Sequence, residues 1–196
     1  TDVVQDGTII NALQEETATG DAHEGTLTST ENISPTLIHQ EFIKTVGIFV
    51  NETLENLVTI ATEVNLDAVQ LHGDEDEAFI QSLKERTNVE VWKAVQIRSA
   101  ADAEAWIDSS ADMLLFDAYH KDERGGTGEV FDWSCLDEFE RPFMLAGGID
   151  STNVARAIRT VRPYGIDISS GIETEGVKDD EKIKAFTNIV RTIAMP

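Results

Sequence analysis

Cysteine is nearly absent from this chain, since Cys135 is the single cysteine among 196 residues. One cysteine excludes an intrachain disulfide and a cluster of thiolate metal ligands. No apolar run approaches the ~20 residues that a membrane-spanning helix needs. The printed sequence also does not open with a basic segment followed by an apolar stretch, so we expect no secretory signal. Together these absences lead us to expect a cytoplasmic protein.

Basic residues are also scarce, because 15 lysines and arginines face 37 aspartates and glutamates, for a net charge of −22. Such a surface repels nucleic acid and anionic membranes, so we expect neither as a partner. The acidic excess indicates either an ordinary solubilising face or adaptation to high salt, where ions screen the self-repulsion. An anionic substrate must then be held by local groups against this field.

Apolar, β-branched runs begin near residues 46, 68, 89, 113, 143 and 166. They are continuous and not alternating, as expected of parallel strands covered by helices. Segments with helical spacing of apolar residues lie between them. Six such units at intervals of 20 to 30 residues predict an α/β fold, a (βα)8 TIM barrel. The strand-like runs are Val46–Val50, Ala68–His72, Val89–Ile97, Met113–Ala118, Phe143–Gly148 and Ile166–Gly171.

The N-terminal region fits a barrel in length but not in composition. The 45 residues before Val46 could hold two further βα units, and a thin mapping gives strands at Val3–Val4 and Thr26–Thr28 with a helix at Ile9–Glu16. Residues 1–32 are polar, however, and could equally be disordered. We therefore expect one barrel domain over residues 1–196, in which the first two units are divergent, incomplete or replaced.

Two glycine-containing segments end the last two predicted strands: Gly147-Gly148 and Ser170-Gly171. Loops after the last two strands of such barrels commonly bind phosphate through backbone N–H groups, and glycine allows close approach. Each segment alone could be only a tight turn. Their occurrence at consecutive strand ends favours a phosphate site.

Two titratable side chains also end predicted strands. Asp117 follows an apolar strand and would face the mouth of the barrel, where a carboxyl group can act as a general acid; a helix cap or a solvated strand end is the alternative. His72 ends another strand and is either catalytic or simply satisfied within the rim. It has no cysteine or histidine at ligand spacing, so we expect no metal site. Cys135 is expected to be a packing residue.

A third glycine-rich segment, Gly125-Gly126-Thr127-Gly128, is either a flexible loop or a lid that closes over a substrate and excludes water.

Taken in order, these segments resemble the phosphoribosylanthranilate isomerase family of tryptophan biosynthesis, from about Ile33 to the C-terminus. Any one segment is weakly specific, whereas the ordered set is highly specific. The matching segments are Val46–Asn51, Val69–Glu75, Leu115–Asp117, Gly125–Gly128, Phe131–Trp133, Leu145–Gly148, Pro163–Glu173 and Gly176–Asp179.

The resemblance implies an Amadori rearrangement of N-(5′-phosphoribosyl)anthranilate, without cofactor or metal, on a small phosphoribosyl substrate. It makes Asp117 the general acid and places Asp167 near the ribose. It also implies that Gln70 and His72 line the mouth of the barrel. It assigns phosphate contacts to Gly147, Gly148, Ser170 and Gly171. Association with other tryptophan-pathway enzymes is a further option.

The sequence departs from this family in its first third. The family's general base is a cysteine ending the first strand, and if Val3–Gly7 occupies that strand, Asp6 stands in its place. The family's arginine for the anthranilate carboxylate aligns with Glu31, which would repel that carboxylate. Two alternatives therefore remain open: a catalytically impaired or silent phosphate-binding barrel, and another sugar-phosphate barrel enzyme.

Overall fold

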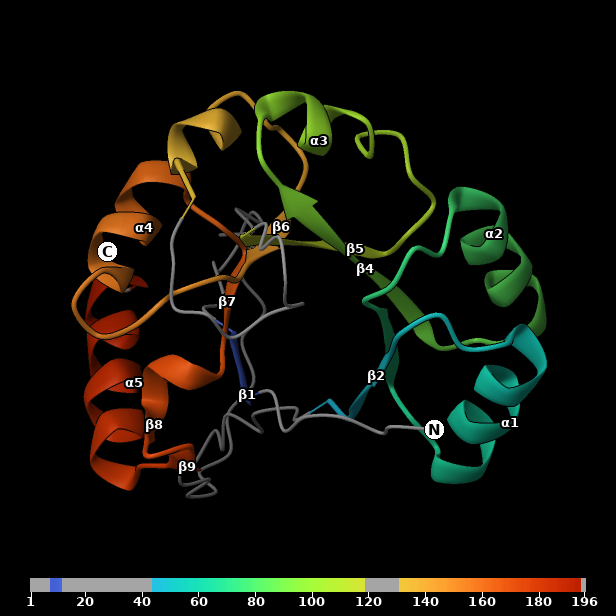
Figure 1. Ribbon diagram of the computed structural model, residues 1–196, viewed down its shortest axis with the longest axis horizontal. Helices are drawn as coiled ribbons and strands as arrows, with labels where there is room; N and C mark the ends of the chain where they lie inside the picture. Colours follow the sequence, from blue (N-terminus) through green and yellow to red (C-terminus); the bar gives the residue numbers. More distant parts are fainter. Residues whose placement is uncertain (1–7, 12–43, 119–130, 195–196) are drawn as a thin grey trace, which may run out of the picture.

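The computed structural model describes residues 8–11, 44–118 and 131–194. A curved sheet lines the inside of the molecule and helices cover its outside (Figure 1). The strands are β1 (Thr8–Asn11), β2 (Val46–Phe49), β3 (Ala68–Leu71), β4 (Glu90–Ile97), β5 (Met113–Ala118), β6 (Phe143–Leu145) and β7 (Gly165–Ile168), with a small hairpin of β8 (Glu173–Thr174) and β9 (Val177–Lys178). The helices are α1 (Leu54–Val64), α2 (Glu77–Arg86), α3 (Ala100–Glu104), α4 (Val154–Val161) and α5 (Asp180–Ala194), and the short 3₁₀ turns are η1 (Trp133–Leu136) and η2 (Ser170–Ile172).

The main sheet has the strand order β1-β7-β6-β5-β4-β3-β2, and β2 to β7 are parallel neighbours in chain order. In the described segments, the helices between the parallel strands lie on the outer face of the sheet, as expected of βα units. All six predicted strands are confirmed: Met113–Ala118 matches at both ends, and the ends of the others differ by at most three residues. The (βα)-barrel class is confirmed with them, as a half-barrel of six parallel strands.

Alternate residues of the strands supply two separate cores. The outer core includes Leu114, Phe116, Leu145 and Ile166, which pack against the helices. A smaller cluster of Ala94, Leu115, Met144 and Ala146 covers the inner face. Because side chains alternate between the faces of a strand, both faces being apolar explains the continuous apolar runs in the sequence.

The strand β1 departs from barrel geometry, because it pairs with β7 in the antiparallel direction, Thr8 opposite Ile168 and Asn11 opposite Gly165. The sequence-based helix at Ile9–Glu16 is therefore wrong over Ile9–Asn11. The run Thr8-Ile9-Ile10 is β-branched, and hydrogen bonding to the edge of β7 outweighs a weak helical pattern. The proposed strands at Val3–Val4 and Thr26–Thr28 lie outside the described residues.

Local signals set the helix starts. At α3 the Asp102 carboxylate accepts hydrogen bonds from the backbone N–H groups of Arg98 and Ser99, which satisfies donors at the helix start. Before α4, the Asp150 carboxylate accepts a hydrogen bond from the N–H of Thr152 in the preceding turn, and the helix begins at Val154. No helix in the described segments is long and apolar enough to cross a membrane.

Candidate active site

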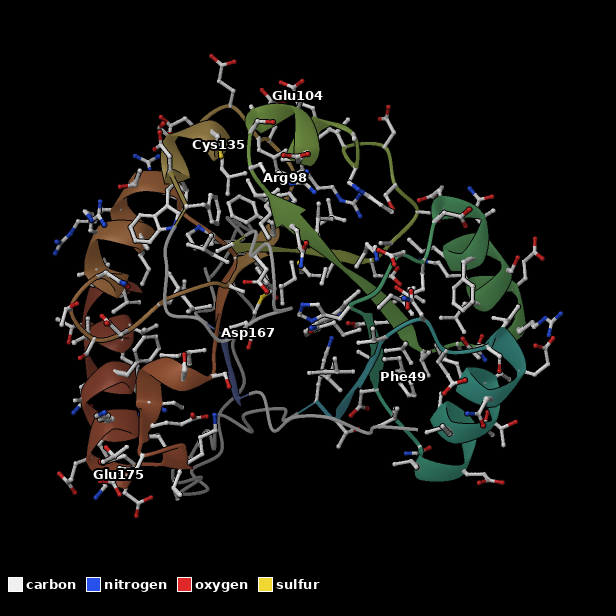
Figure 2. All side chains as sticks on the ribbon, viewed as in Figure 1. Phe49, Arg98, Glu104, Cys135, Asp167 and Glu175 are labelled. Carbon is white, nitrogen blue, oxygen red and sulfur yellow. The ribbon has the colours of Figure 1, made fainter. Side chains whose placement is uncertain are left out.

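The carboxyl ends of the parallel strands form one rim, and most of the predicted site residues lie along it. Gln70 is in β3 with His72 directly after it, Asp117 is in β5, and Asp167 is in β7. In the register of the sheet, Asp117 lies opposite Gln96 of β4. Figure 2 shows Asp167 on the inner side of the curved sheet. The strand ends thus collect polar groups over an otherwise apolar inner face.

A close contact on this rim joins the His72 ring and the Asp117 carboxylate. The Nε2 atom of His72 lies 3.5 Å from Oδ2 of Asp117, whose side chain is only 6% exposed. The other ring nitrogen, Nδ1, is 3.1 Å from Nε2 of Gln70. The Nε2 atom of His72 is buried and makes no hydrogen bond, since Asp117 is its charged neighbour at 3.5 Å. The imidazole therefore lies between a fixed amide and the buried carboxylate.

Asp167 is the titratable group that the rim perturbs most clearly. Burial raises the pKa of Asp167 to about 6, and the nearby Asp117 carboxylate adds to this effect, while His72 and Lys178 oppose it. Two carboxylates that share a poorly solvated region resist ionising together. Asp167 therefore keeps its proton up to about pH 6, well above the range of an ordinary aspartate.

The two glycine loops lie against each other at the ends of β6 and β7. A Cβ atom at Gly171 would lie 2.0 Å from the carbonyl oxygen of Ile149, so the backbones touch where glycine stands. Gly147 and Gly148 have φ angles of 82° and 64°, in the left-handed region. A Cβ atom at Gly147 would lie 2.8 Å from Oδ1 of Asp117. The glycines therefore join the two loops to each other and to the carboxylate.

Some sequence-based candidates are not part of this group. Asp6 and the segment Gly125–Gly128 lie outside the described residues. Cys135 lies on η1 and packs on the outer core, on the helix side of the sheet. Burial raises the pKa of its thiol, and Asp132 adds to this, so the thiolate is disfavoured. No group of residues in the described part of the chain could hold a metal ion.

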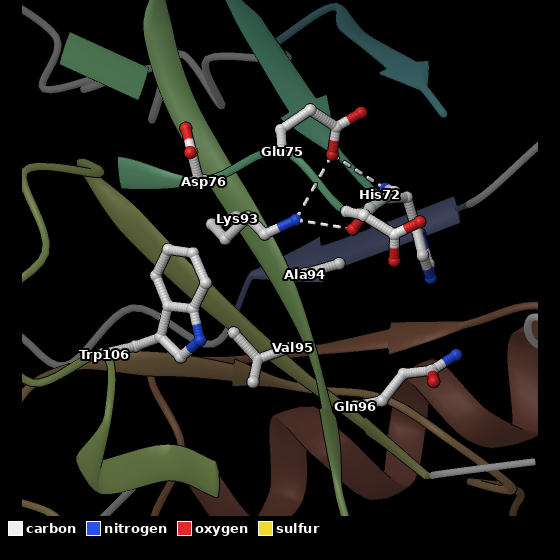
Figure 3. Close-up of a pocket in the computed structure, with 10 residues that line it drawn as sticks. His72, Glu75, Asp76, Lys93, Ala94, Val95, Gln96 and Trp106 are labelled. Carbon is white, nitrogen blue, oxygen red and sulfur yellow. Dashed lines mark hydrogen bonds and ion pairs between the residues drawn. The ribbon is translucent and has the colours of Figure 1, made fainter. Parts of the chain in front are cut away.

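Sequence reasoning missed two buried charges beside the rim, Glu75 and Lys93. Their Oε2 and Nζ atoms are 3.2 Å apart, and Lys93 lies over the Trp106 ring at 5.6 Å (Figure 3). A cavity of about 310 Å³ opens there, with His72 and Gln96 also on its wall. The sequence feature that could have revealed this pair is Lys93 itself, which lies in the middle of an apolar strand, where a charged side chain is rare unless it is paired.

Comparison with known proteins gives consistent results. A family model described as N-(5′-phosphoribosyl)anthranilate (PRA) isomerase matches residues 4–189. A protein of that name from Thermoanaerobacter sp. (strain X514) is 48% identical over 153 residues, 77% of this chain and 74% of the relative. One from Endomicrobium trichonymphae is 45% identical over 151 residues, with the same coverage of both chains.

Solved structures agree with this likeness. A phosphoribosyl anthranilate isomerase from Thermotoga maritima superposes with a TM-score of 0.69 at 35% identity, over 78% of this chain and 75% of the other. A further structure of such an isomerase, 34% identical with a TM-score of 0.65, covers 78% of this chain and 73% of the other. It was determined in complex with reduced 1-(o-carboxyphenylamino)-1-deoxyribulose 5-phosphate.

Proposed function

This chain belongs to the N-(5′-phosphoribosyl)anthranilate isomerase family, and from that premise we propose that it performs the family's reaction in tryptophan biosynthesis, with Asp117 as general acid. The substrate is a small phosphoribosyl compound, and one structure of a related isomerase holds a reduced form of the carboxyphenylamino-deoxyribulose phosphate. The chain is one barrel domain in which residues 1–32 are divergent.

One observation carries the assignment of the residues: the Asp117 carboxylate touches both halves of the rim. Its Oδ2 lies 3.5 Å from His72, and its Oδ1 lies against Gly147 of the first glycine loop. A sugar phosphate held by backbone N–H groups of the two loops would bring its ribose ring over Asp117. The phosphate contacts are then Gly147, Gly148, Ser170 and Gly171.

The chemistry consists of two proton transfers. Asp117 protonates the ring oxygen of the ribose, which opens the ring to a Schiff base. A general base then removes the C2′ proton, and the enolamine tautomerises to the open-chain ketose. Asp167 lies close enough to Asp117 to influence its environment and would contact the ribose. Gln70 and His72 line the mouth, and the segment Gly125–Gly128 would act as the lid.

Turnover of N-(5′-phosphoribosyl)anthranilate, generated in situ and followed by the loss of its fluorescence, tests the proposal. We expect Asp117→Asn to lower kcat ~10²–10⁴-fold, as loss of a general acid does. The variant should still bind inorganic phosphate as the parent does, because the loops are backbone sites. Unchanged turnover by Asp117→Asn would remove this carboxyl from the mechanism.

A second candidate function, a catalytically impaired phosphate-binding barrel, is favoured by one specific observation. The single cysteine lies on the helix side of the sheet, so it cannot be the base at the mouth. Asp6 is the candidate base and Glu31 stands where the family has its arginine; both lie outside the described residues. The double variant Asp6→Cys, Glu31→Arg should raise kcat/KM ~10²-fold if these two positions limit the reaction. Family-level turnover by the unmodified chain would refute impairment.

A further inference from the structure

The buried ion pair of Glu75 and Lys93 is an unusual feature so close to the rim. The two residues are 7% and 2% exposed. Desolvating two charges costs so much that an apolar pair of similar volume is often equally stable or better. Stability alone therefore does not explain this pair, and its hydrogen bonds indicate what else it does.

The pair holds both backbone groups of Gly73, the residue directly after His72. Lys93 Nζ donates to the carbonyl oxygen of Gly73 at 2.7 Å, and Glu75 Oε2 accepts from its N–H at 2.9 Å. The other carboxylate oxygen of Glu75 accepts from the N–H of Asn51, after β2, at 2.6 Å. One buried pair thus ties the ends of β2 and β3 to the middle of β4, as the dashed lines of Figure 3 show in part.

His72 is therefore fixed on both sides along the chain. Its backbone N–H donates to the carbonyl oxygen of Phe49 at 2.8 Å, and the next residue is the one that Glu75 and Lys93 hold. The space around Gly73 is full, since a Cβ atom there would lie 2.3 Å from Oδ1 of Asn51. The ring is then presented to Asp117 at 3.5 Å, a distance at which a small shift makes or breaks a hydrogen bond.

We propose that Glu75 and Lys93 are positioning residues, which set the orientation of the His72 ring against Asp117 in the isomerase reaction. This inference rests on the proposed function. The hydrogen bonds of the pair described above go to Gly73, directly after His72, and to Asn51 after β2. We infer that the pair acts through His72. Its loss should affect the chemical step and leave the phosphate side of the rim intact.

The test is the double variant Glu75→Gln, Lys93→Met, which removes both charges and leaves no unpaired buried ion. Glu75→Gln alone is a second variant, in which the amide oxygen can still accept from Gly73 while Lys93 loses its carboxylate partner. The matched control is Lys84→Met. Lys84 Nζ is 2.5 Å from Asp112, which also accepts from the N–H of Val91, so this ion pair braces β4 near its amino end, two residues before Lys93. A purely structural role in bracing β4 predicts similar effects from the loss of either ion pair.

We expect the double variant to lose ~10²-fold in kcat with KM changed less than about threefold, whereas Lys84→Met keeps both. The NMR signals of the His72 ring, assigned with His72→Asn, should move in the double variant and in Glu75→Gln but not in the control. Unmoved His72 signals, or an unchanged kcat in the folded double variant, would overturn the inference. Absence of turnover in the parent chain would refute the proposed function instead, and the His72 signals would still decide whether the pair positions the ring.

Discussion

The two sides of the rim are built differently. On the side of β3, β4 and β5, the groups proposed for the chemistry are side chains, with a buried ion pair and an amide next to the imidazole that faces Asp117. On the side of β6 and β7, the groups proposed to bind phosphate are backbone N–H groups, and the glycine loops touch each other directly. In our proposal, the first side performs proton transfer and the second holds the anion.

The same contrast follows from the physical demands of the two tasks. A proton donor must be held within hydrogen-bond reach of one atom, which requires fixed side chains. A phosphate group offers several equivalent oxygens, and backbone N–H groups can bind it wherever glycine lets the chain approach. The overall charge of −22 opposes the binding of a phosphate group. Local backbone N–H groups at the glycine loops therefore matter more here than they would in a basic protein.

The largest expected effect tests whether the two sides of the rim are independent. Asp167 lies on the β7 side, yet its pKa is raised in part by Asp117 on β5. Its pKa of about 6 in the folded protein exceeds the ordinary 3.8. The stability that protonated Asp167 contributes is therefore fully present below about pH 4 and is lost as the pH rises through 6. Relative to the parent, Asp167→Asn should gain up to about 3 kcal/mol in the free energy of unfolding between pH 4 and pH 7. Urea unfolding of both proteins at the two pH values measures this difference.

The control for this measurement is Asp117→Asn, which removes the neighbouring charge and should reduce the pH-dependent difference at Asp167. If Asp167→Asn differed from the parent by the same amount at both pH values, the coupling across the rim would be refuted.

A smaller effect is expected on the side of the rim that we propose to bind phosphate. Gly171→Ala should weaken phosphate binding and raise KM about tenfold, because the new methyl group meets the Ile149 carbonyl oxygen and forces the loops apart. Since the acid lies on another strand, kcat should change less. Gly176→Ala in the turn of the β8–β9 hairpin is the matched control, since it strains a φ of 77° but meets no atom within 4 Å. Phosphate titration and steady-state kinetics give both numbers, and equal KM values for the two variants would contradict the prediction.

The smallest expected effect is the counterpart on the other side. Gly73→Ala should lower kcat about fivefold with little change in KM, because the methyl group would collide with Asn51 and shift the residue that follows His72. The kinetic comparison with Gly171→Ala is itself the control. A rise in KM for Gly73→Ala as large as that for Gly171→Ala would show that the two sides of the rim do not divide the tasks.

Much of the fold could be predicted from the sequence because its signals are local. The continuous apolar runs of the six strands and the amphipathic pattern of the helices each depend on neighbouring residues only. The same is true of Asp117, Gly147 and Gly171, whose positions at strand ends place them on one rim once the strands are parallel. The ordered motifs also identified the family, which the comparisons confirm.

The tertiary structure decided what depends on partners distant in the sequence. The antiparallel direction of β1 comes from an available edge on β7, 154 or more residues away, and no local pattern encodes that direction. In the sequence, Lys93 is only a charged residue within an apolar strand. The structure shows that its partners are the Glu75 carboxylate and the carbonyl group of Gly73. The raised pKa of Asp167 likewise requires burial and the Asp117 carboxylate together. By itself, therefore, the sequence determined which residues form the strands and reach the rim. Only the folded chain set the distance between His72 and Asp117 and the burial of Asp167 near Asp117, because both depend on distances that close packing alone fixes.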